Sequence, residues 1–536
     1  MHIFINDYIL CIKDKEFMKV LKKHKNIVIL ILLTLVFFSS SLVITSDSTH
    51  YLKYVNILEH NAPFSSWDIV RGPIFPIIIS INNFLFGRSG LGMMAGMYIF
   101  YLLYCLIIYA FSNILFKKTK HKNILITVLC IFCIVNPLIL GYFHTMLTEY
   151  VAITLTMGSL YMGWKWYQIK TRKEQILYGL YFCFGISFSY FLKQPYICCV
   201  LIPMVISIAY SLIINKKNSN KTYYFGTLFI AIIMLIISSI SWNKFLEIKG
   251  VNLKTGRDSS GMLSTQLLNS IDGYKITKIN NYEKIKNDKY LTKTEKKAIK
   301  KELKKHKKVM ILNIYNGKKL LEKDFLRINK GNKASGKDTI LEIANTFFKH
   351  PSIVIRSYSK NYCGLSSICI IESEDGIQYH VTDKMELIKM FENEIIPFKS
   401  FRYEDKYIYY PPERKEFVDE YIFPINQGLI SKLITYLFLP TSILFKLVTF
   451  LSLIYIIILV TIRIIFRKCL KKKELYLLSL MFLSFSFLTI VANALSGAMI
   501  DRYSVICFIP GLLGFIGTIL FTISNLNKKE KINKKI

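Results

Sequence analysis

Acidic side chains are scarce in most of this chain. Of its 35 aspartate and glutamate residues, 24 lie between positions 242 and 427, which leaves eleven for the other 350 residues. The chain is also 52% hydrophobic, with a mean hydropathy of +0.37, and this composition excludes an ordinary soluble protein. Apolar runs of about 20 residues recur along it, each long enough to cross ~30 Å of hydrocarbon. The sequence therefore predicts an α-helical polytopic membrane protein.

A disulfide framework is lacking as well. Most of the eleven cysteines lie inside apolar runs, where a thiol is usually a small core residue. Cys363 and Cys369 lie in the long polar segment and could pair if that segment is exported, a point that their spacing leaves open. No cleavable signal peptide is evident, because the basic stretch up to Lys25 leads into a full-length apolar run without a small-residue cleavage site. We expect this first span to remain as an anchor.

The net charge of +35 does not point to nucleic acid, because of how it is distributed. The segment 242–427 holds 35 lysines and arginines against its 24 acids, and most of the remaining excess lies in short basic clusters between apolar runs. Such clusters are typical of the cytoplasmic loops of membrane proteins. We therefore expect a plasma-membrane protein with both termini in the cytoplasm, surrounded by lipid and without a nucleic-acid partner.

About ten transmembrane helices with both termini inside satisfy every short basic loop. They are predicted at about 26–45, 90–116, 123–141, 147–163, 176–192, 195–214, 223–242, 439–466, 475–495 and 503–524. The chain then divides into an N-terminal transmembrane module (1–242, with a first outer loop at 46–88), an extracytoplasmic domain of mainly helical or mixed structure (243–428), and C-terminal transmembrane helices (429–536).

Three local expectations accompany this division. Pro73 and Pro76 each lack a backbone donor, so the apolar stretch 71–87 is predicted to be broken and juxtamembrane rather than a clean span. The lysine-rich stretch 292–308 is predicted to be a solvated helix. An extra half-span at 430–440 is expected to lie in the membrane interface.

Five of the eleven remaining acids fall on the outer side of the predicted topology. They are Asp47, Glu59, Asp68, Glu149 and Asp501. A carboxylate beside hydrocarbon is costly, by about 2.5–3.5 kcal/mol at a helix centre on insertion scales. Their collection on one side predicts a polar chamber there, where chemistry or transport takes place.

Two of these acids begin predicted helices. If 47–60 is helical, Asp47, His50, Tyr51 and Tyr54 share one face. A partly desolvated carboxylate at Asp47 can act as a general base, and the same residue is equally suited to cap the helix. Glu149 is either a second carboxylate of the chamber or a first-turn acid that complements the helix dipole.

Three cations lie on the same outer side, each at the end of a predicted apolar segment: Arg71, Lys193 and Arg502. A guanidinium can bind a phosphate through two parallel hydrogen bonds. Each of these side chains could instead extend to the lipid headgroups. Their joint occurrence with several carboxylates on one face favours a site for a phosphate-bearing substrate.

This combination resembles the C-type (GT-C) membrane glycosyltransferases, especially the branch that contains protein O-mannosyltransferases and the aminoarabinose transferase. The matching features are Asp47 and Tyr51 at the start of the first outer loop, R-x-P-x-x-P and a closing F-G at 71–87, Thr148-Glu149 at the opening of the fourth span, a basic residue before proline at 193–195 at the opening of the sixth, and Arg502-Tyr503 at the opening of the last. The stretch 344–355 also resembles a helix followed by His-Pro in these enzymes. The likeness covers mainly the first 200 or so and the last 40 or so residues.

The sequence departs from the family pattern in three places. Asp47 is followed by Ser48, where the family often has a second acid, so Glu59 or Asp68 supplies it or one carboxylate suffices. Lys193 stands where the family frequently has arginine, and a lysine cannot bind a phosphate in the bidentate way that an arginine can. The W-W-D-Y-G signature of oligosaccharyltransferases is absent, so transfer of a whole glycan to asparagine is not expected.

The resemblance implies an inverting transferase that moves a sugar from a polyprenyl-phosphate donor to a cell-envelope lipid, glycan or protein at the extracytoplasmic face. Its implied catalytic residues are Asp47 as general base, with Glu149 and Glu59 orienting the acceptor or binding a divalent cation; Arg71, Lys193, Arg502 and Tyr503 would bind the donor phosphate, and His50, Tyr51 and Asp68 the substrate. The metal requirement, the sugar and the acceptor stay open. The alternatives are a polysaccharide polymerase or ligase, and a lipid or solute transporter.

Overall fold

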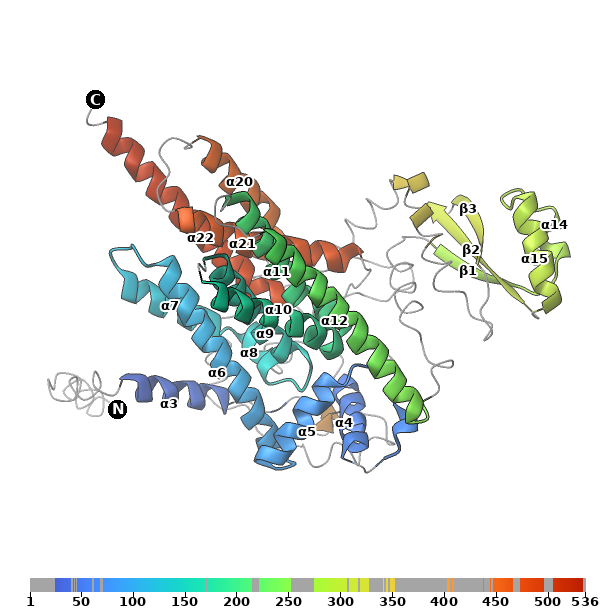
Figure 1. Cartoon of the computed structure of the whole chain (residues 1–536), viewed down its shortest axis with the longest axis horizontal. Helices are drawn as coiled ribbons and strands as arrows, with labels where there is room; N and C mark the ends of the chain where they lie inside the picture. The colour runs from blue at the N-terminus through green and yellow to red at the C-terminus, as the bar shows by residue number, and fades with distance from the viewer. Residues whose placement is uncertain are drawn as a thin grey trace.

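A computed structural model of the chain is dominated by helices (Figure 1). It describes residues 25–39, 42, 44, 46–59, 62–67, 71–168, 171–214, 221–251, 274–305, 308–316, 319–326, 341, 344–345, 348–351, 403–404, 407–408, 437, 444, 447–465, 473–495 and 505–533. The predicted half-span at 430–440 and the pair Cys363 and Cys369 lie outside the residues described in enough detail to test them.

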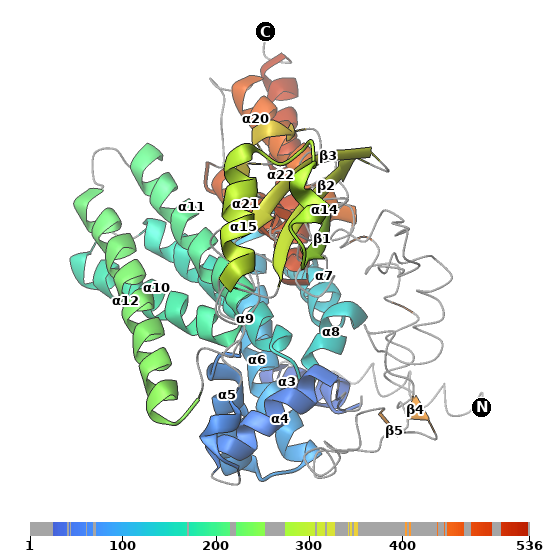
Figure 2. The same cartoon turned by 90° about the vertical axis from the view of Figure 1, so that its right-hand side faces the viewer.

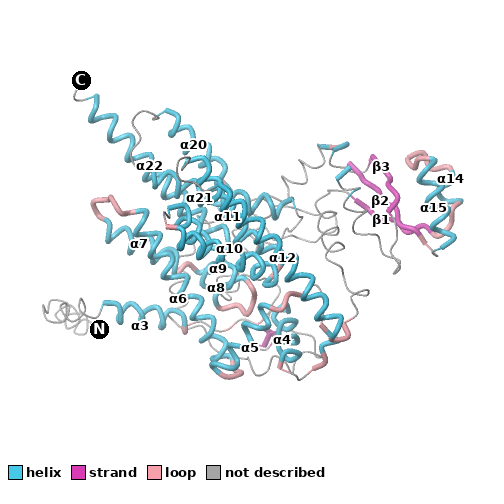
Figure 3. The backbone as a smooth tube through the Cα atoms, in the orientation of Figure 1, coloured by secondary structure: helices cyan, strands magenta, loops and turns pink. Residues whose placement is uncertain are grey.

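The helical part runs through the N-terminal half and returns at the C-terminal end (Figure 3). Its elements are α3 (Lys25–Phe37), α4 (Ser46–Leu58), η1 (Phe64–Ser66), α5 (Ile74–Phe86), α6 (Gly90–Leu115), α7 (Lys122–Ile134), α8 (Pro137–Phe143), α9 (Glu149–Gln168), α10 (Arg172–Leu192), η2 (Gln194–Ile197), α11 (Cys198–Ile214), α12 (Lys221–Ile248), α20 (Ser452–Ile465), α21 (Lys473–Leu495) and α22 (Val505–Asn533).

Six helices in the described part are long and apolar enough to cross a bilayer. These segments are Gly90–Leu115, Lys173–Leu192, Gln194–Leu212, Tyr223–Ile248, Glu474–Ala492 and Val505–Leu526. Four shorter apolar helices accompany them: Ile27–Phe37, Ile74–Phe86, Lys122–Ile134 and Ser452–Ile465. The chain is thus a helical protein suited to a membrane, while the count of ten spans and their orientation stay predictions.

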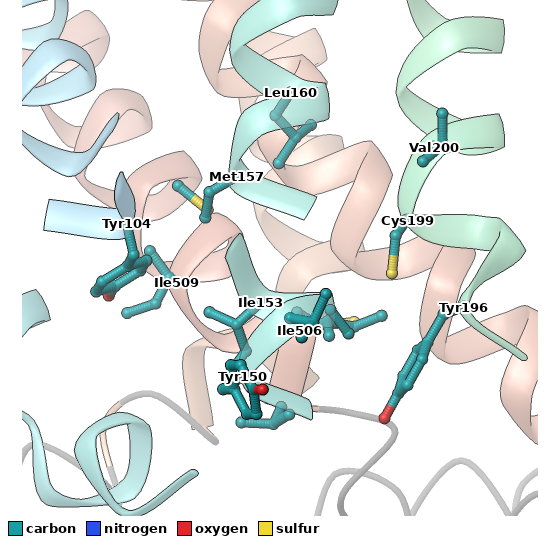
Figure 4. Close-up of a cluster of buried hydrophobic side chains, with 14 of the residues drawn as sticks. Tyr104, Tyr150, Ile153, Met157, Leu160, Tyr196, Cys199, Val200, Ile506 and Ile509 are labelled. Atoms are coloured by element: carbon teal, nitrogen blue, oxygen red, sulfur yellow. The ribbon is translucent and has the colours of Figure 1, made fainter. Parts of the chain in front are cut away.

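The centre of the bundle is formed by helices from both ends of the chain. Helix α9 packs against α6, α11 and α22, and α22 packs in turn against α21. Figure 4 shows the side chains that fill this centre, with Ile153 and Met157 of α9 in the same cluster as Ile506 and Ile509 of α22. All four are buried, so α9 from the N-terminal half and α22 from the C-terminal end share one apolar core.

Helices α21 and α22 approach each other closely through small residues. A methyl group on Gly514 or Gly517 of α22 would collide with Leu483 or Ser479 of α21. Ser486 Oγ of α21 donates a hydrogen bond of 3.0 Å to the carbonyl oxygen of Cys507. Small residues that let two backbones approach, joined by a serine hydrogen bond, are typical of helix packing within a bilayer.

Helix α12 lies along the outside of the bundle in both Figure 1 and Figure 2. It packs on α10, yet many of its large apolar side chains are exposed, among them Phe225, Phe229, Ile236, Ile237 and Ile240. A helix that is apolar all round and largely uncovered by protein needs an apolar solvent, and lipid supplies one.

Two local expectations about the helices were wrong in detail. The stretch after Pro73 is not broken: α5 is one regular helix, because Pro73 and Pro76 lie at its start, where the first amides have no partner within the helix. Conversely, the third predicted span (123–141) is two helices. Helix α7 ends before Asn136, whose Oδ1 accepts a hydrogen bond of 3.4 Å from the amide of Ile139 in α8.

The polar segment contains a small unit of mixed structure. Its elements are β1 (Tyr274–Ile279), α14 (Glu283–Lys286), α15 (Lys293–Lys305), β2 (Val309–Asn316) and β3 (Lys319–Leu326), followed much later by a pair of two-residue strands, β4 (Tyr403–Glu404) and β5 (Tyr407–Ile408). Strands β1, β2 and β3 form an antiparallel sheet in that order. Ile285, Leu291, Ile299, Val309 and Ile311 form its apolar core. The predicted solvated helix is confirmed as α15.

Candidate functional site

The guanidinium of Arg71 rests on Tyr51, a residue of α4. Arg71 Nη1 donates a hydrogen bond of 3.2 Å to Tyr51 Oη, and its Cζ atom lies 5.3 Å from the centre of the same ring. The backbone at Arg71 is fixed too, because Trp67 Nε1 donates a hydrogen bond of 3.0 Å to its carbonyl oxygen. Tyr51 is buried, so it holds a cation in place just before the start of α5.

Gly72 brings this cation to the end of α10. A methyl group on Gly72 would collide with the backbone carbonyl of Phe191, so the two main chains touch. Arg71 adjoins one side of this contact, and Lys193 lies two residues beyond the other. Segments 120 residues apart in the sequence therefore place two predicted phosphate-binding cations in one neighbourhood.

Lys193 occupies the extended junction between α10 and η2, with φ −169° and ψ 130°. Its Nζ atom lies 3.9 Å from Glu149 Oε1, and its side chain is 13% exposed while that of Glu149 is 0% exposed. Glu149 opens α9, where its charge complements the helix dipole, and its Oε2 accepts a hydrogen bond of 3.2 Å from Thr148 Oγ1. Glu149 and Lys193 therefore form a buried ion pair.

Aromatic rings and one serine connect these residues to α4. The ring centre of Phe75 lies 4.7 Å from that of Tyr51 and 5.8 Å from that of Tyr150, the residue after Glu149. Ser48 Oγ of α4 donates a hydrogen bond of 2.7 Å to the carbonyl oxygen of Met146. Tyr51, Arg71, Glu149 and Lys193 are called the Arg71–Lys193 cluster below.

The first turn of α4 adjoins this cluster and carries Asp47. The helix over 46–58 confirms the expected periodicity, so Asp47 lies one turn before Tyr51 on the same helical face, about 6 Å along the axis. The structure describes the backbone of Asp47 but not its side chain. His50, on the same helix, is half-buried.

Glu59 belongs to a different group of side chains. Arg88 Nη1 lies 3.1 Å from Glu59 Oε2, Asn83 Nδ2 donates a hydrogen bond of 2.9 Å to Glu59 Oε1, and Arg88 Nη2 donates one of 2.5 Å to Asn56 Oδ1. Glu59 lies about 12 Å along the axis of α4 from Tyr51. The structure thus does not bring Glu59 to the Arg71–Lys193 cluster. Instead, Glu59 joins the end of α4 to α5 and to the start of α6.

Other predicted site residues lie outside the described part of the chain. These are Asp68, Asp501, Arg502 and Tyr503.

A divalent cation held jointly by Glu149 and Glu59 does not fit this arrangement. Glu149 lies against Lys193 and Thr148, whereas Glu59 lies against Arg88 and Asn83, about 12 Å along the axis of α4 from Tyr51. Among the described residues, no three His, Cys, Asp or Glu side chains gather in a way that could hold a metal ion.

An aromatic group borders the cluster where α12 ends. Trp67 packs on Trp242 of α12 with ring centres 5.5 Å apart, and Phe191 lies 6.5 Å from Trp242. Sequence reasoning missed Trp67, Gly72, Phe75 and Trp242. A signal was present for Gly72 alone, since a glycine between an arginine and a proline is a place where another backbone can approach.

Within the Arg71–Lys193 cluster, the described side chains comprise two cations, one buried carboxylate and one phenol. The cluster lies where α9 begins and α10 ends, and Tyr51 joins it to α4. Such cations can stabilise an anionic group, a phosphate in particular, at the boundary of the hydrocarbon.

Comparisons with known protein families, curated proteins and solved structures find no match.

Proposed function

We propose that this chain is a membrane glycosyltransferase of the GT-C type, which moves a sugar from a polyprenyl-phosphate donor to an acceptor of the cell envelope at the extracytoplasmic face. The observation that carries the proposal is the convergence of Arg71 and Lys193, from separate segments, beside the face of α4 on which Asp47 lies. A transferase of this kind needs a base for the acceptor and cations for the leaving phosphate in one place.

The reaction is an inverting displacement. An acceptor hydroxyl or amine attacks the anomeric carbon, and Asp47 takes the proton that the acceptor loses. The bond between the anomeric carbon and the phosphate oxygen breaks, and both of its electrons leave with the lipid phosphate. Arg71 and Lys193 face the negative charge that grows on that phosphate, and cations aimed there stabilise the transition state more than the bound donor.

In this mechanism Glu149 is a positioning residue. Its buried carboxylate lies 3.9 Å from Lys193 Nζ and holds that cation at the junction of α10 and η2. Tyr51 serves Arg71 in the same way through its hydrogen bond and its ring. Glu59, joined to Arg88, stabilises the first outer loop and takes no part in the chemistry.

The test is transfer of radiolabelled sugar from a polyprenyl-phosphate donor by membranes that contain the chain. We expect Asp47→Asn to abolish transfer with unchanged insertion, and Arg71→Met to lower it by about 10²-fold or more, as for loss of one transition-state contact. Glu174→Gln is the matched control: this acid also lies in the first turn of a helix, but it accepts its hydrogen bond from the exposed Thr171. Activity of Asp47→Asn within a few-fold of wild type would reject the general base.

The same membranes discriminate the alternatives. Reconstituted vesicles that take up a lipid or solute without any sugar transfer would favour a transporter. Joining of preformed polysaccharide units, without use of a single-sugar donor, would favour a polymerase or ligase.

A further inference from the structure

Helix α15 of the small mixed unit carries seven lysines and two acids in thirteen residues. At 100° per residue, the lysines occupy about half of the helix circumference, and no acid falls between them. This surface, called the lysine arc, consists of Lys293, Lys296, Lys297, Lys300, Lys301, Lys304 and Lys305. It extends over about 20 Å along the helix.

The rest of α15 is used by the fold. Ile299 is 0% exposed in the apolar core under the sheet, and Leu303 packs against the same core. Glu295 Oε2 accepts hydrogen bonds of 2.7 Å from the amide and the hydroxyl of Thr292, which caps the helix start. Glu302 Oε1 lies 3.8 Å from Lys305 Nζ. Glu302 therefore neutralises the arc at one edge, at Lys305, while the apolar face and Glu295 point away from it. All lysines of the arc except the partly buried Lys296 are exposed.

The chemistry of the arc selects among anionic partners. Protein interfaces are depleted in lysine and depend on aromatic or arginine anchors, and α15 contains neither. Insertion into a membrane surface needs an apolar face, but that of α15 is buried in its own unit. A row of ammonium groups on flexible stems suits point-charge contacts with phosphates, without the forked geometry that carboxylates favour.

We propose that the lysine arc binds a linear polymer that carries repeated phosphate charges. A stripe about 20 Å long engages several charges of one chain at once, whereas a single small anion meets only one or two lysines. The proposal goes beyond sugar transfer and does not depend on it.

The experiment measures binding of fluorescently labelled linear polyphosphate to the full chain in an uncharged detergent, by fluorescence anisotropy between roughly 50 and 200 mM salt. The variant is Lys297→Glu/Lys301→Glu/Lys304→Glu, since all three lysines are exposed. We expect at least about tenfold weaker binding, and a slope of log affinity against log salt that is smaller by about 2, as for three lost phosphate contacts on a single strand.

The control is Lys275→Glu/Lys278→Glu/Lys319→Glu, which makes the same charge change at exposed positions on the sheet of the same unit. We expect it to bind polyphosphate within about twofold of wild type. A second variant, with glutamine at the three α15 positions, should give an intermediate loss. Glutamate and glutamine are good helix formers, so α15 is retained.

Three results would overturn the proposal. The first is that the α15 variant binds polyphosphate as tightly as wild type, or that the control variant loses as much affinity as the α15 variant. The second is equally tight binding of polyglutamate, which would point to an acidic protein. The third is preferential competition by vesicles of anionic phospholipid, which would point to a membrane surface.

Discussion

The ion pair between Glu149 and Lys193 offers the sharpest test of the cluster. Glu149 is 0% exposed and Lys193 13% exposed, with 3.9 Å between Nζ and Oε1. At an effective dielectric constant of about 20, two charges at that distance attract by about 4 kcal/mol, which desolvation largely offsets. Removing one partner leaves the other charge buried, and that costs about 3–5 kcal/mol.

We therefore expect Lys193→Met to lower the free energy of unfolding by about 3–5 kcal/mol, because it leaves a fully buried carboxylate without its cation. Glu149→Gln should cost less, about 2 kcal/mol, because a lysine at the end of a helix can extend toward water. The double variant should be more stable than the sum of the two losses predicts, by at least about 1 kcal/mol.

The assay is reversible unfolding in mixed micelles of increasing SDS content, followed by far-ultraviolet circular dichroism. Glu174→Gln serves as the control, because the carboxylate of Glu174 accepts an exposed hydrogen bond from Thr171 at the start of α10. We expect this variant to change the free energy of unfolding by no more than about 0.5 kcal/mol. Losses that add fully in the double variant would show that the two side chains do not stabilise each other, and the positioning role of Glu149 would then be withdrawn.

Three further outcomes follow from the structure. Gly72→Ala should destabilise the protein by about 1–3 kcal/mol and reduce sugar transfer, because the methyl group meets the backbone of Phe191; wild-type unfolding and transfer would contradict the close contact. Glu59→Gln should weaken the contact with Arg88 and cost about 1 kcal/mol in unfolding while transfer is kept, whereas lost transfer at full stability would return Glu59 to the chemistry. Burial raises the pKa of Asp288, but hydrogen bonds and the charges of nearby lysines outweigh this effect and lower the pKa below its usual value. The carboxylate therefore stabilises the fold above about pH 3.9, and this stabilisation is lost as the pH falls through the folded pKa. Asp288→Asn should remove this pH-dependent part of the stability, which rate-corrected hydrogen exchange of β2 and β3 measures.

The sequence predicted the helices better than their contacts. A long apolar run such as 90–116 must form a helix in a bilayer, because its backbone polar groups find no other partners there, and α6 matches that run closely. The two prolines of 71–87 were misread because their effect depends on position: at the start of α5 the missing amides would have had no partner in any case. The division at Asn136 was missed because an apolar run alone does not show where a helix bends.

The candidate site was predictable as a collection of residue types and not as a set of pairs. Charges at helix ends indicated that Arg71, Glu149 and Lys193 belong to one side. Which cation meets which carboxylate depends on backbone contacts such as that at Gly72, and no local periodicity encodes them. Glu59 is the converse case: its position in the sequence suggested the same site, but the structure pairs it with Arg88 and not with the Arg71–Lys193 cluster.

The shared core of α9 and α22 has a consequence for biosynthesis. The ribosome completes α9 long before α22, and at about 5–20 residues per second the interval between them is on the order of tens of seconds. Throughout that time Ile153 and Met157 lack the contacts that Ile506 and Ile509 will supply, so lipid or the insertion machinery must cover their apolar side chains. The early helices thus enter the membrane as an unfinished assembly, which α22 completes.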